Sequence, residues 1–177
     1  MQEYKLYPTA EINFDVCFKK CVLFLNEIGI ETIYKKLDKY CFLPGLSIRN
    51  GAIIIDKGGL KYPGDLLHEA GHIAVVPAAE RYTLTAASIE KRENREAEEM
   101  MAIAWSYAAC IHLDIDPYFV FHDVGYKGGG SCIADNFNNK NYFGLPMLQW
   151  KGMAADEKKA ADLQVKPYPF MLKWVLD

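Results

Sequence analysis

The chain has 177 residues, of which 51% are hydrophobic and 24% charged, a composition typical of a folded globular protein rather than a disordered one. This length suffices to bury a substantial core, so we expect one domain over residues 1–177. The formal net charge of −3 and the lack of a sustained basic run argue against nucleic acid as a partner.

Cysteine usage and hydropathy indicate the compartment. The longest apolar run, residues 100–113, is too short to span a bilayer, so no membrane association is predicted. Residues 1–5 lack the basic and apolar regions of a secretory signal. The five cysteines are odd in number and form no C-x-x-C pair, which argues against a disulfide framework. We therefore expect a cytoplasmic protein.

The first predicted element is a helix over residues 13–29. Apolar residues recur there at helical spacing, and Gly29 is a typical helix terminator. Cys17 and Cys21 share the apolar face, where core packing is the expected role and a metal-binding pair is the alternative. A shorter helix is expected over about residues 31–40.

A β-hairpin is predicted next. Two apolar stretches, residues 42–49 and 52–56, flank Asn50-Gly51, which is the strongest short hairpin signal. If one of these strands lies at a sheet edge beside a metal site, an extended peptide could pair with it. The alternative is a purely structural hairpin.

The sequence His68-Glu69-Ala70-Gly71-His72 contains the chemistry-bearing motif H-E-x-x-H. A helix is expected around it, because Pro63 and Asp65 are start signals and Pro77 is a stop signal. Residues four apart lie on one face of a helix, so His68 and His72 can offer two imidazoles to one metal ion.

This arrangement suits Zn²⁺, which accepts two His and a carboxylate and keeps one position open for water. Glu69 is turned by roughly 100° about the helix axis, so it reaches the water rather than the metal. It can then take a proton during attack on a carbonyl. The alternative is a core helix with two buried His, but Gly71 costs a helix interior roughly 1 kcal/mol relative to Ala. A small residue there suggests close packing.

Downstream of Pro77, a mixed stretch over residues 78–89 leads into a predicted long helix over residues 90–113. Its first half is charged and its second half apolar. The aromatic, glycine-rich residues 118–131 match no phosphate-binding pattern and are expected to form a flexible loop at a cleft.

A third ligand must come from outside the motif, because catalytic zinc normally has three protein ligands. A third His at the H-x-x-G-x-x-H spacing is absent, since Val75 and Ala78 occupy those positions. Glu99 is the first choice, because it lies where the charged half of the long helix meets the apolar half and would be costly to bury unpaired. The other candidates are Glu96, Glu80, His112 and His122.

These features resemble the gluzincin branch of the zincin metallopeptidases, in which strands precede the H-E-x-x-H helix and a downstream helix supplies a Glu. The 27-residue interval from His72 to Glu99 is similar to that of ImmA/IrrE-type metallopeptidases. In that family the Glu is followed by a large apolar residue at +4 and Ala at +5, as by Ile103 and Ala104 here.

The resemblance covers residues 46–113 and has one departure. Met100 and Met101 stand where the family commonly has Ala and then Asn or Asp. The resemblance implies an α+β, zincin-like fold: a small antiparallel or mixed sheet, the H-E-x-x-H helix, and a second long helix carrying the third metal ligand.

Together these observations predict a zinc-dependent metallopeptidase in which His68, His72 and Glu99 hold Zn²⁺ and Glu69 is the general base. The expected partner is a peptide or protein substrate. Charge developing on the carbonyl oxygen needs another donor. The candidates are His122, which precedes Asp123 and is the first choice, Tyr126 and Tyr107. One alternative is a non-catalytic or regulatory zincin-fold scaffold that binds a protein or small molecule; another is a hydrolase of a non-peptide amide.

Overall fold

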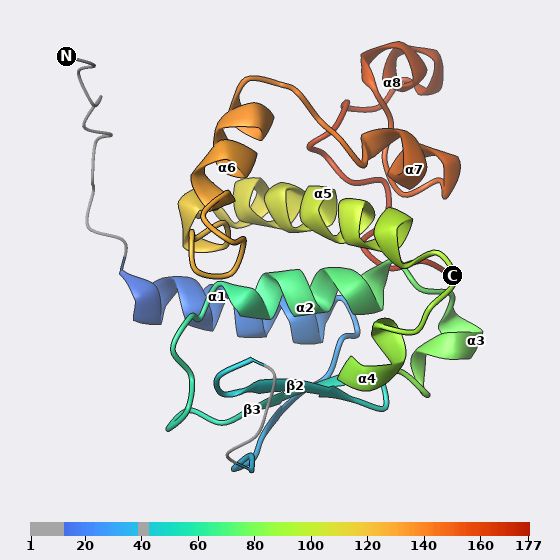
Figure 1. Ribbon diagram of the computed structural model, residues 1–177. Coiled ribbons are helices and arrows are strands. Elements are labelled where there is room, and N and C mark those ends of the chain that lie inside the picture. Colours follow the sequence, from blue (N-terminus) through green and yellow to red (C-terminus); the bar gives the residue numbers. More distant parts are fainter. Residues whose placement is uncertain (1–12, 39–42) are drawn as a thin grey trace, which may run out of the picture.

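The computed structural model describes residues 13–38 and 43–177, and within them the fold is α+β, with a three-stranded mixed sheet and eight α-helices (Figure 1). In chain order the elements are α1 (Phe14–Glu27), β1 (Thr32–Tyr34), β2 (Leu46–Arg49), β3 (Ala52–Ile55), α2 (Asp65–Ala74), α3 (Ala78–Arg81), α4 (Ala86–Ile89), α5 (Arg95–Leu113), the 3₁₀ turn η1 (Pro117–Phe119), α6 (Gly130–Asn138), α7 (Leu145–Trp150) and α8 (Glu157–Leu163).

The predicted hairpin is confirmed. Strands β2 and β3 pair antiparallel, with Arg49 opposite Ala52. Asn50 and Gly51 connect them with φ angles of 52° and 74°, as the type I′ turn of a two-residue hairpin requires. The outer edge of β2 is bridged at both of its ends, by Leu43 opposite Leu46 and by Thr85 opposite Arg49. Little of this edge is free for an added peptide strand, which favours the purely structural hairpin.

The short helix predicted over residues 31–40 is wrong for the residues that the structure describes. Thr32–Tyr34 form strand β1, which pairs parallel with the central strand β3. The β-branched and aromatic side chains of this segment favour a strand, and β3 offers an unpaired edge to it. Residues 39 and 40 of the predicted helix lie outside the described ranges.

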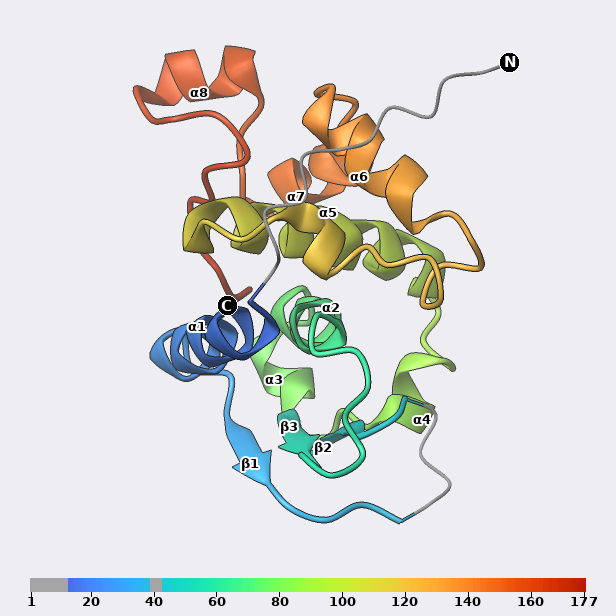
Figure 2. The same cartoon turned by 90° about the vertical axis from the view of Figure 1, so that its left-hand side faces the viewer.

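Helix α2 lies between the sheet and α5, with α1 beside it (Figures 1 and 2). It confirms the helix predicted around the motif. Its apolar residues are fully buried: Leu66, Leu67, Ala70, Ile73 and Ala74. This burial provides most of the free energy that holds a helix of only ten residues in place.

Helices α2 and α5 run antiparallel and approach closely at Gly71. A Cβ atom there would lie only 2.8 Å from the carbonyl oxygen of Ala102, so a glycine is needed at this contact. Leu67 lies one turn before Gly71 on α2, and its carbonyl oxygen is 3.3 Å from the hydroxyl of Ser106 on α5. The close packing expected from Gly71 is therefore a backbone-to-backbone contact with α5.

The long helix begins later than predicted, at Arg95 rather than residue 90. Residues 90–94 form turns, because Arg92 folds back to bind Glu98 in the first turn of α5 and Glu80 in α3. From Met101 to Cys110 every residue of α5 is buried, in agreement with the apolar second half.

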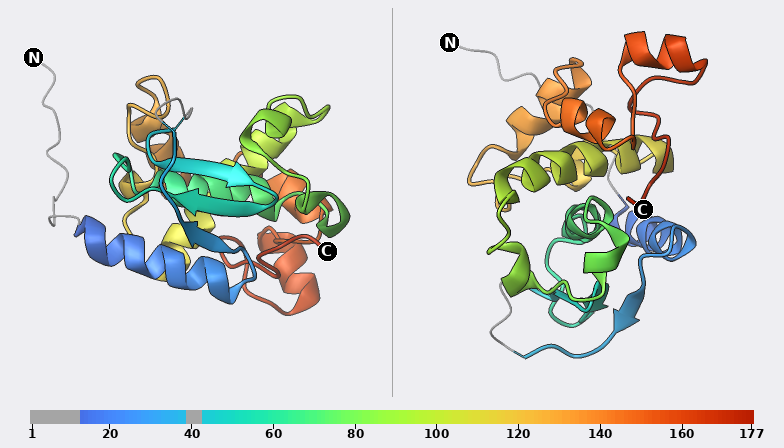
Figure 3. Two further views of the ribbon diagram at one scale, coloured as in Figure 1. Left: turned by 90° about the horizontal axis from the view of Figure 1, so that it is seen from below. Right: turned by 90° about the vertical axis from the view of Figure 1, so that its right-hand side faces the viewer.

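The C-terminal segment after α8 packs against α2 and α5 (Figure 3). The indole Nε1 of Trp105 donates to the carbonyl oxygen of Trp174 at 2.7 Å. The backbone N–H of Leu176 donates to the carbonyl oxygen of Ala74, at the C-terminal end of α2, at 2.8 Å. In residues 13–38 and 43–177, no helix has the length and apolar character needed to cross a membrane.

Candidate metal centre

Three ligand-type side chains from two helices converge on one point. The Nε2 atoms of His68 and His72 are 3.2 Å apart. Glu99 places one carboxylate oxygen 3.5 Å from the Nε2 atom of His68 and the other 3.3 Å from that of His72. This group could hold a metal ion. The structure thus brings together the three residues predicted as ligands.

Helix α2 supplies the two imidazoles because the residues are four apart on one face. The rings lie edge to face, with centroids 4.7 Å apart. Burial lowers the pKa of His68 to about 4 and, together with the neighbouring His68, that of His72 to about 3. Both imidazoles are therefore neutral at pH 7, the form in which His binds a metal ion.

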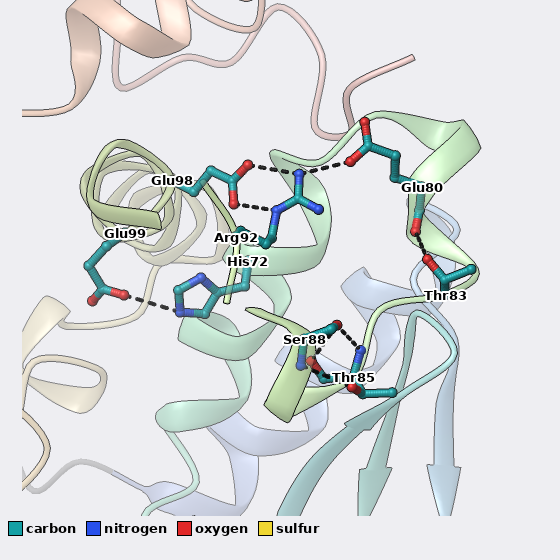
Figure 4. A network of polar contacts seen from close by, with 8 residues as sticks. All are labelled: His72, Glu80, Thr83, Thr85, Ser88, Arg92, Glu98 and Glu99. Atoms are coloured by element: carbon teal, nitrogen blue, oxygen red, sulfur yellow. Dashed lines mark hydrogen bonds and ion pairs between the residues drawn. The ribbon is translucent and has the colours of Figure 1, made fainter. Parts of the chain in front are cut away.

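Glu99 points toward His72 while its neighbour Glu98 points toward Arg92 (Figure 4). The Arg92 side chain binds both oxygens of Glu98, with Nε at 2.6 Å and Nη2 at 2.9 Å, and Nη2 also lies 2.9 Å from Glu80. Adjacent residues on a helix point about 100° apart, so with Glu98 held by Arg92, Glu99 faces α2.

The other candidate ligands lie elsewhere. Glu96 is exposed on the first turn of α5, and Glu80 is paired with Arg92. His112 contacts the rings of Phe24 and Trp174, at the far end of α5. None of them belongs to the three-residue group.

Glu69 lines the same cleft as the three candidate ligands. Burial, followed by the negative charges of Asp65 and Glu99, raises the pKa of its carboxyl to about 8. This pKa belongs to the metal-free site. A bound cation would lower the pKa of the neighbouring carboxyl, so that Glu69 could accept a proton and later donate it.

Tyr126 contacts the outer nitrogen of His68. Its hydroxyl lies 3.1 Å from Nδ1 and its ring meets the imidazole edge to face. When Nε2 faces a metal ion, Nδ1 carries the proton and donates it to this hydroxyl. In the sequence Tyr126 is one of three candidate oxyanion donors, and in the structure its hydroxyl contacts a candidate ligand. Tyr107, another of these candidates, donates to the Oδ1 atom of Asn138 at 3.2 Å.

His122 fixes the loop that carries Tyr126. Its Nε2 lies 2.8 Å from Asp65 in the first turn of α2, and its Nδ1 accepts from the backbone N–H of Gly125 at 3.2 Å. Tyr62 stacks on its ring at 4.4 Å. Both nitrogens are thus occupied, which leaves His122 no free donor for a substrate. The sequence marks Asp65 only as a helix start signal, because its partner His122 lies 57 positions away.

The candidate metal centre opens into a cleft of about 390 Å³, lined by His68, Glu69, His72, Glu99, Asp65, Tyr126, Gly125, Lys127, Arg95, Glu90, Ile89, Ala86 and Leu43. The glycine-rich stretch 118–131 therefore borders a cleft, as predicted. A larger cavity of about 580 Å³, lined by aromatic residues that include Tyr168 and Trp174, shares no residue with this centre.

Comparisons with models of known protein families, with curated proteins and with solved structures gave no significant match. The functional inference for this chain therefore depends on the geometry of the centre itself.

Proposed function

We propose that the protein is a zinc-dependent metallopeptidase that hydrolyses peptide bonds at this centre. The observation that carries the proposal is the spacing of the three ligand atoms. A tetrahedral zinc ion with ligand bonds of about 2.0–2.1 Å has ligand atoms about 3.3 Å apart. The two Nε2 atoms are 3.2 Å apart, one Glu99 oxygen lies 3.5 Å from that of His68 and the other lies 3.3 Å from that of His72. One ligand atom from each residue lies within 4.8 Å of the other two, which is a spacing that one metal ion can draw together. Two neutral imidazoles and one carboxylate leave a fourth position open, as in catalytic rather than structural zinc sites.

Each residue has a defined task in this proposal. His68, His72 and Glu99 hold the ion, and Tyr126 orients His68. When bound, zinc polarises the substrate carbonyl and lowers the pKa of a bound water to about 7. Glu69 accepts a proton from the attacking water and donates it to the leaving amine as the C–N bond breaks. The substrate lies in the cleft rather than along the outer edge of β2, which is bridged at both ends.

The order and packing of the elements support a zincin-like relationship. A strand hairpin precedes the motif helix, and a second long helix brings Glu99 against it, as the resemblance to gluzincins and ImmA/IrrE-type metallopeptidases implies. The resemblance covers residues 46–113, so the helices after α5 stand outside it. The single domain over residues 1–177 and the cytoplasmic location stay predictions.

The proposal is tested by zinc content and peptide hydrolysis measured together. We expect near-stoichiometric zinc in the wild type and in Glu96→Ala, which serves as the matched control, and its loss in Glu99→Ala. Glu69→Gln is expected to keep zinc and to lose hydrolysis of a peptide library by a factor of at least about 100, because it removes the proton acceptor. Undiminished turnover in Glu69→Gln contradicts its assigned task. Bound zinc without hydrolysis in the wild type favours the non-catalytic scaffold.

A further inference from the structure

Two cationic side chains, Arg95 and Lys127, line the cleft on either side of the metal centre. Because α2 and α5 are antiparallel, Arg95 at the start of α5 lies beyond the His72 end of α2. Its positive charge contributes to the low pKa of His72. Lys127 follows Tyr126 and therefore lies at the His68 end. The two cations thus mark opposite ends of the cleft.

Arg95 lies one helical turn before Glu99, on the same face of α5. The guanidinium is exposed, and within residues 13–38 and 43–177 it forms no ion pair or hydrogen bond. Arg92, three residues earlier, is fully engaged with Glu98 and Glu80. Arg95 is therefore available to a ligand in the cleft.

The chemistry of Arg95 favours a carboxylate. A guanidinium is planar and binds a carboxylate through two parallel hydrogen bonds. The negative Glu90 lines the same cleft, and its charge disfavours a polyanion such as a phosphate chain while tolerating one carboxylate held against Arg95. One helical turn is about 5.4 Å, so the carboxylate would lie one or two residues from the bond that is cleaved.

We propose that Arg95 binds a carboxylate of the substrate, so that the enzyme acts on peptides with a carboxylate close to the scissile bond. This inference rests on the proposed peptidase function and names its substrate class. The carboxylate is either the free C-terminus of the peptide or the side chain of an Asp or Glu.

The first test uses affinity and needs no turnover. The probes are chains of two to four carbons with a hydroxamate at one end, which binds zinc, and either a carboxylate or a carboxamide at the other. On zinc-loaded wild type, calorimetry is expected to show at least about tenfold tighter binding of one carboxylate probe than of its carboxamide twin. Arg95→Gln is expected to remove this preference without weakening the carboxamide probe, whereas Lys127→Gln, which removes a charge at the other end, is expected to keep it.

Equal binding of the two twins by the wild type, or loss of the preference in Lys127→Gln but not in Arg95→Gln, overturns the inference while the zinc site stands. Failure of every hydroxamate to bind overturns the zinc site and the inference with it.

The second test identifies the source of the carboxylate. A randomised hexapeptide library is synthesised once as free acids and once as C-terminal amides, and the products of zinc-loaded enzyme are read by mass spectrometry. Cleavage near the terminus of the acids alone identifies the C-terminal carboxylate. Cleavage beside Asp or Glu in both libraries identifies the side chain. Cleavage that depends on neither carboxylate contradicts the proposal.

Discussion

Tyr126 and His68 form the contact on which the orientation of the first candidate ligand depends. The hydroxyl of Tyr126 is 3.1 Å from Nδ1, and the two residues are 58 positions apart in the chain. In metal sites such partners fix the tautomer and the ring orientation of the ligating His. The loop that brings Tyr126 to this position is held in turn by the contact between His122 and Asp65.

We expect Tyr126→Phe to weaken zinc binding by roughly 10–100-fold, because it removes the acceptor of the His68 Nδ1 proton and keeps the aromatic ring. Competition with a chromophoric chelator measures the change. Tyr107→Phe is the control, since it also deletes a bonded hydroxyl but one that contacts Asn138. Equal zinc affinity in wild type and Tyr126→Phe would show that the contact does not support the metal.

For single residues, the sequence predicted the site correctly where the candidate ligands are close together along the chain. His68 and His72 lie four residues apart, so helix periodicity alone places them on one face. Glu99 required an argument from the change of polarity along α5. The surroundings of His68 were not predictable, because the contacts of Tyr126 and Asp65 join residues 58 and 57 positions apart. No local pattern encodes such distances.

Among the helices and strands, the antiparallel contact of α2 and α5 fixes the geometry of the candidate metal centre. Two candidate ligands lie on α2 and one on α5, so the distance between the helix axes sets the distance between the ligands. Gly71 allows the helices to approach, since a Cβ atom there would meet the backbone and side chain of Ala102 at 2.8–3.1 Å.

Gly71→Ala is therefore expected to lower the free energy of unfolding by about 1–3 kcal/mol through overpacking, despite the roughly 1 kcal/mol that Ala gains over Gly in a helix interior. It is also expected to reduce zinc affinity, because the ligands move apart. Chemical denaturation and zinc titration measure the two effects. Gly58→Ala is the control, since a Cβ atom there has only one ordinary contact, at 3.5 Å with Asp56. A stabilised Gly71→Ala variant would contradict the close-packing argument.

Elements with a local signal were predicted well. The hairpin at Asn50-Gly51 and the motif helix both carry local start and stop signals, and both are confirmed. Strand β1 was missed because its pairing partner β3 lies about 20 residues downstream, and short segments take their structure from such partners. The predicted start of α5 was wrong because the Arg92 side chain pairs with Glu98, which holds the preceding charged residues in turns.

The stability of the whole molecule is expected to depend on pH and on bound metal, because several acidic groups lie close together at the candidate metal centre. In the metal-free protein the pKa of Glu69 is raised from 4.5 to about 8. An acid with a raised pKa favours the folded state when protonated. Its contribution is therefore complete below about pH 4.5 and is lost as the pH rises through about 8.

We expect metal-free Glu69→Gln to unfold at the same temperature as metal-free wild type near pH 4.5. The variant is expected to unfold at least about 5 °C higher at pH 8.5, because raising the pKa from 4.5 to about 8 corresponds to a difference of up to about 5 kcal/mol. Thermal unfolding followed by circular dichroism in the presence of a chelator gives both values. A difference that does not change with pH would show that ionisation of Glu69 is not its cause. Bound zinc is expected to reduce the difference in unfolding temperature between the two proteins at pH 8.5, because its positive charge stabilises the carboxylate of Glu69.

The hydrogen bond from Leu176 to Ala74 has a consequence for biosynthesis. It joins the C-terminal end of the motif helix to residues translated about a hundred positions later. A nascent chain on the ribosome can form the hairpin and the turns of α2 early, but this contact is made only after residue 176 has left the exit tunnel. The C-terminal end of the motif helix is accordingly expected to reach its final packing about a hundred residues of synthesis after the helix itself has emerged.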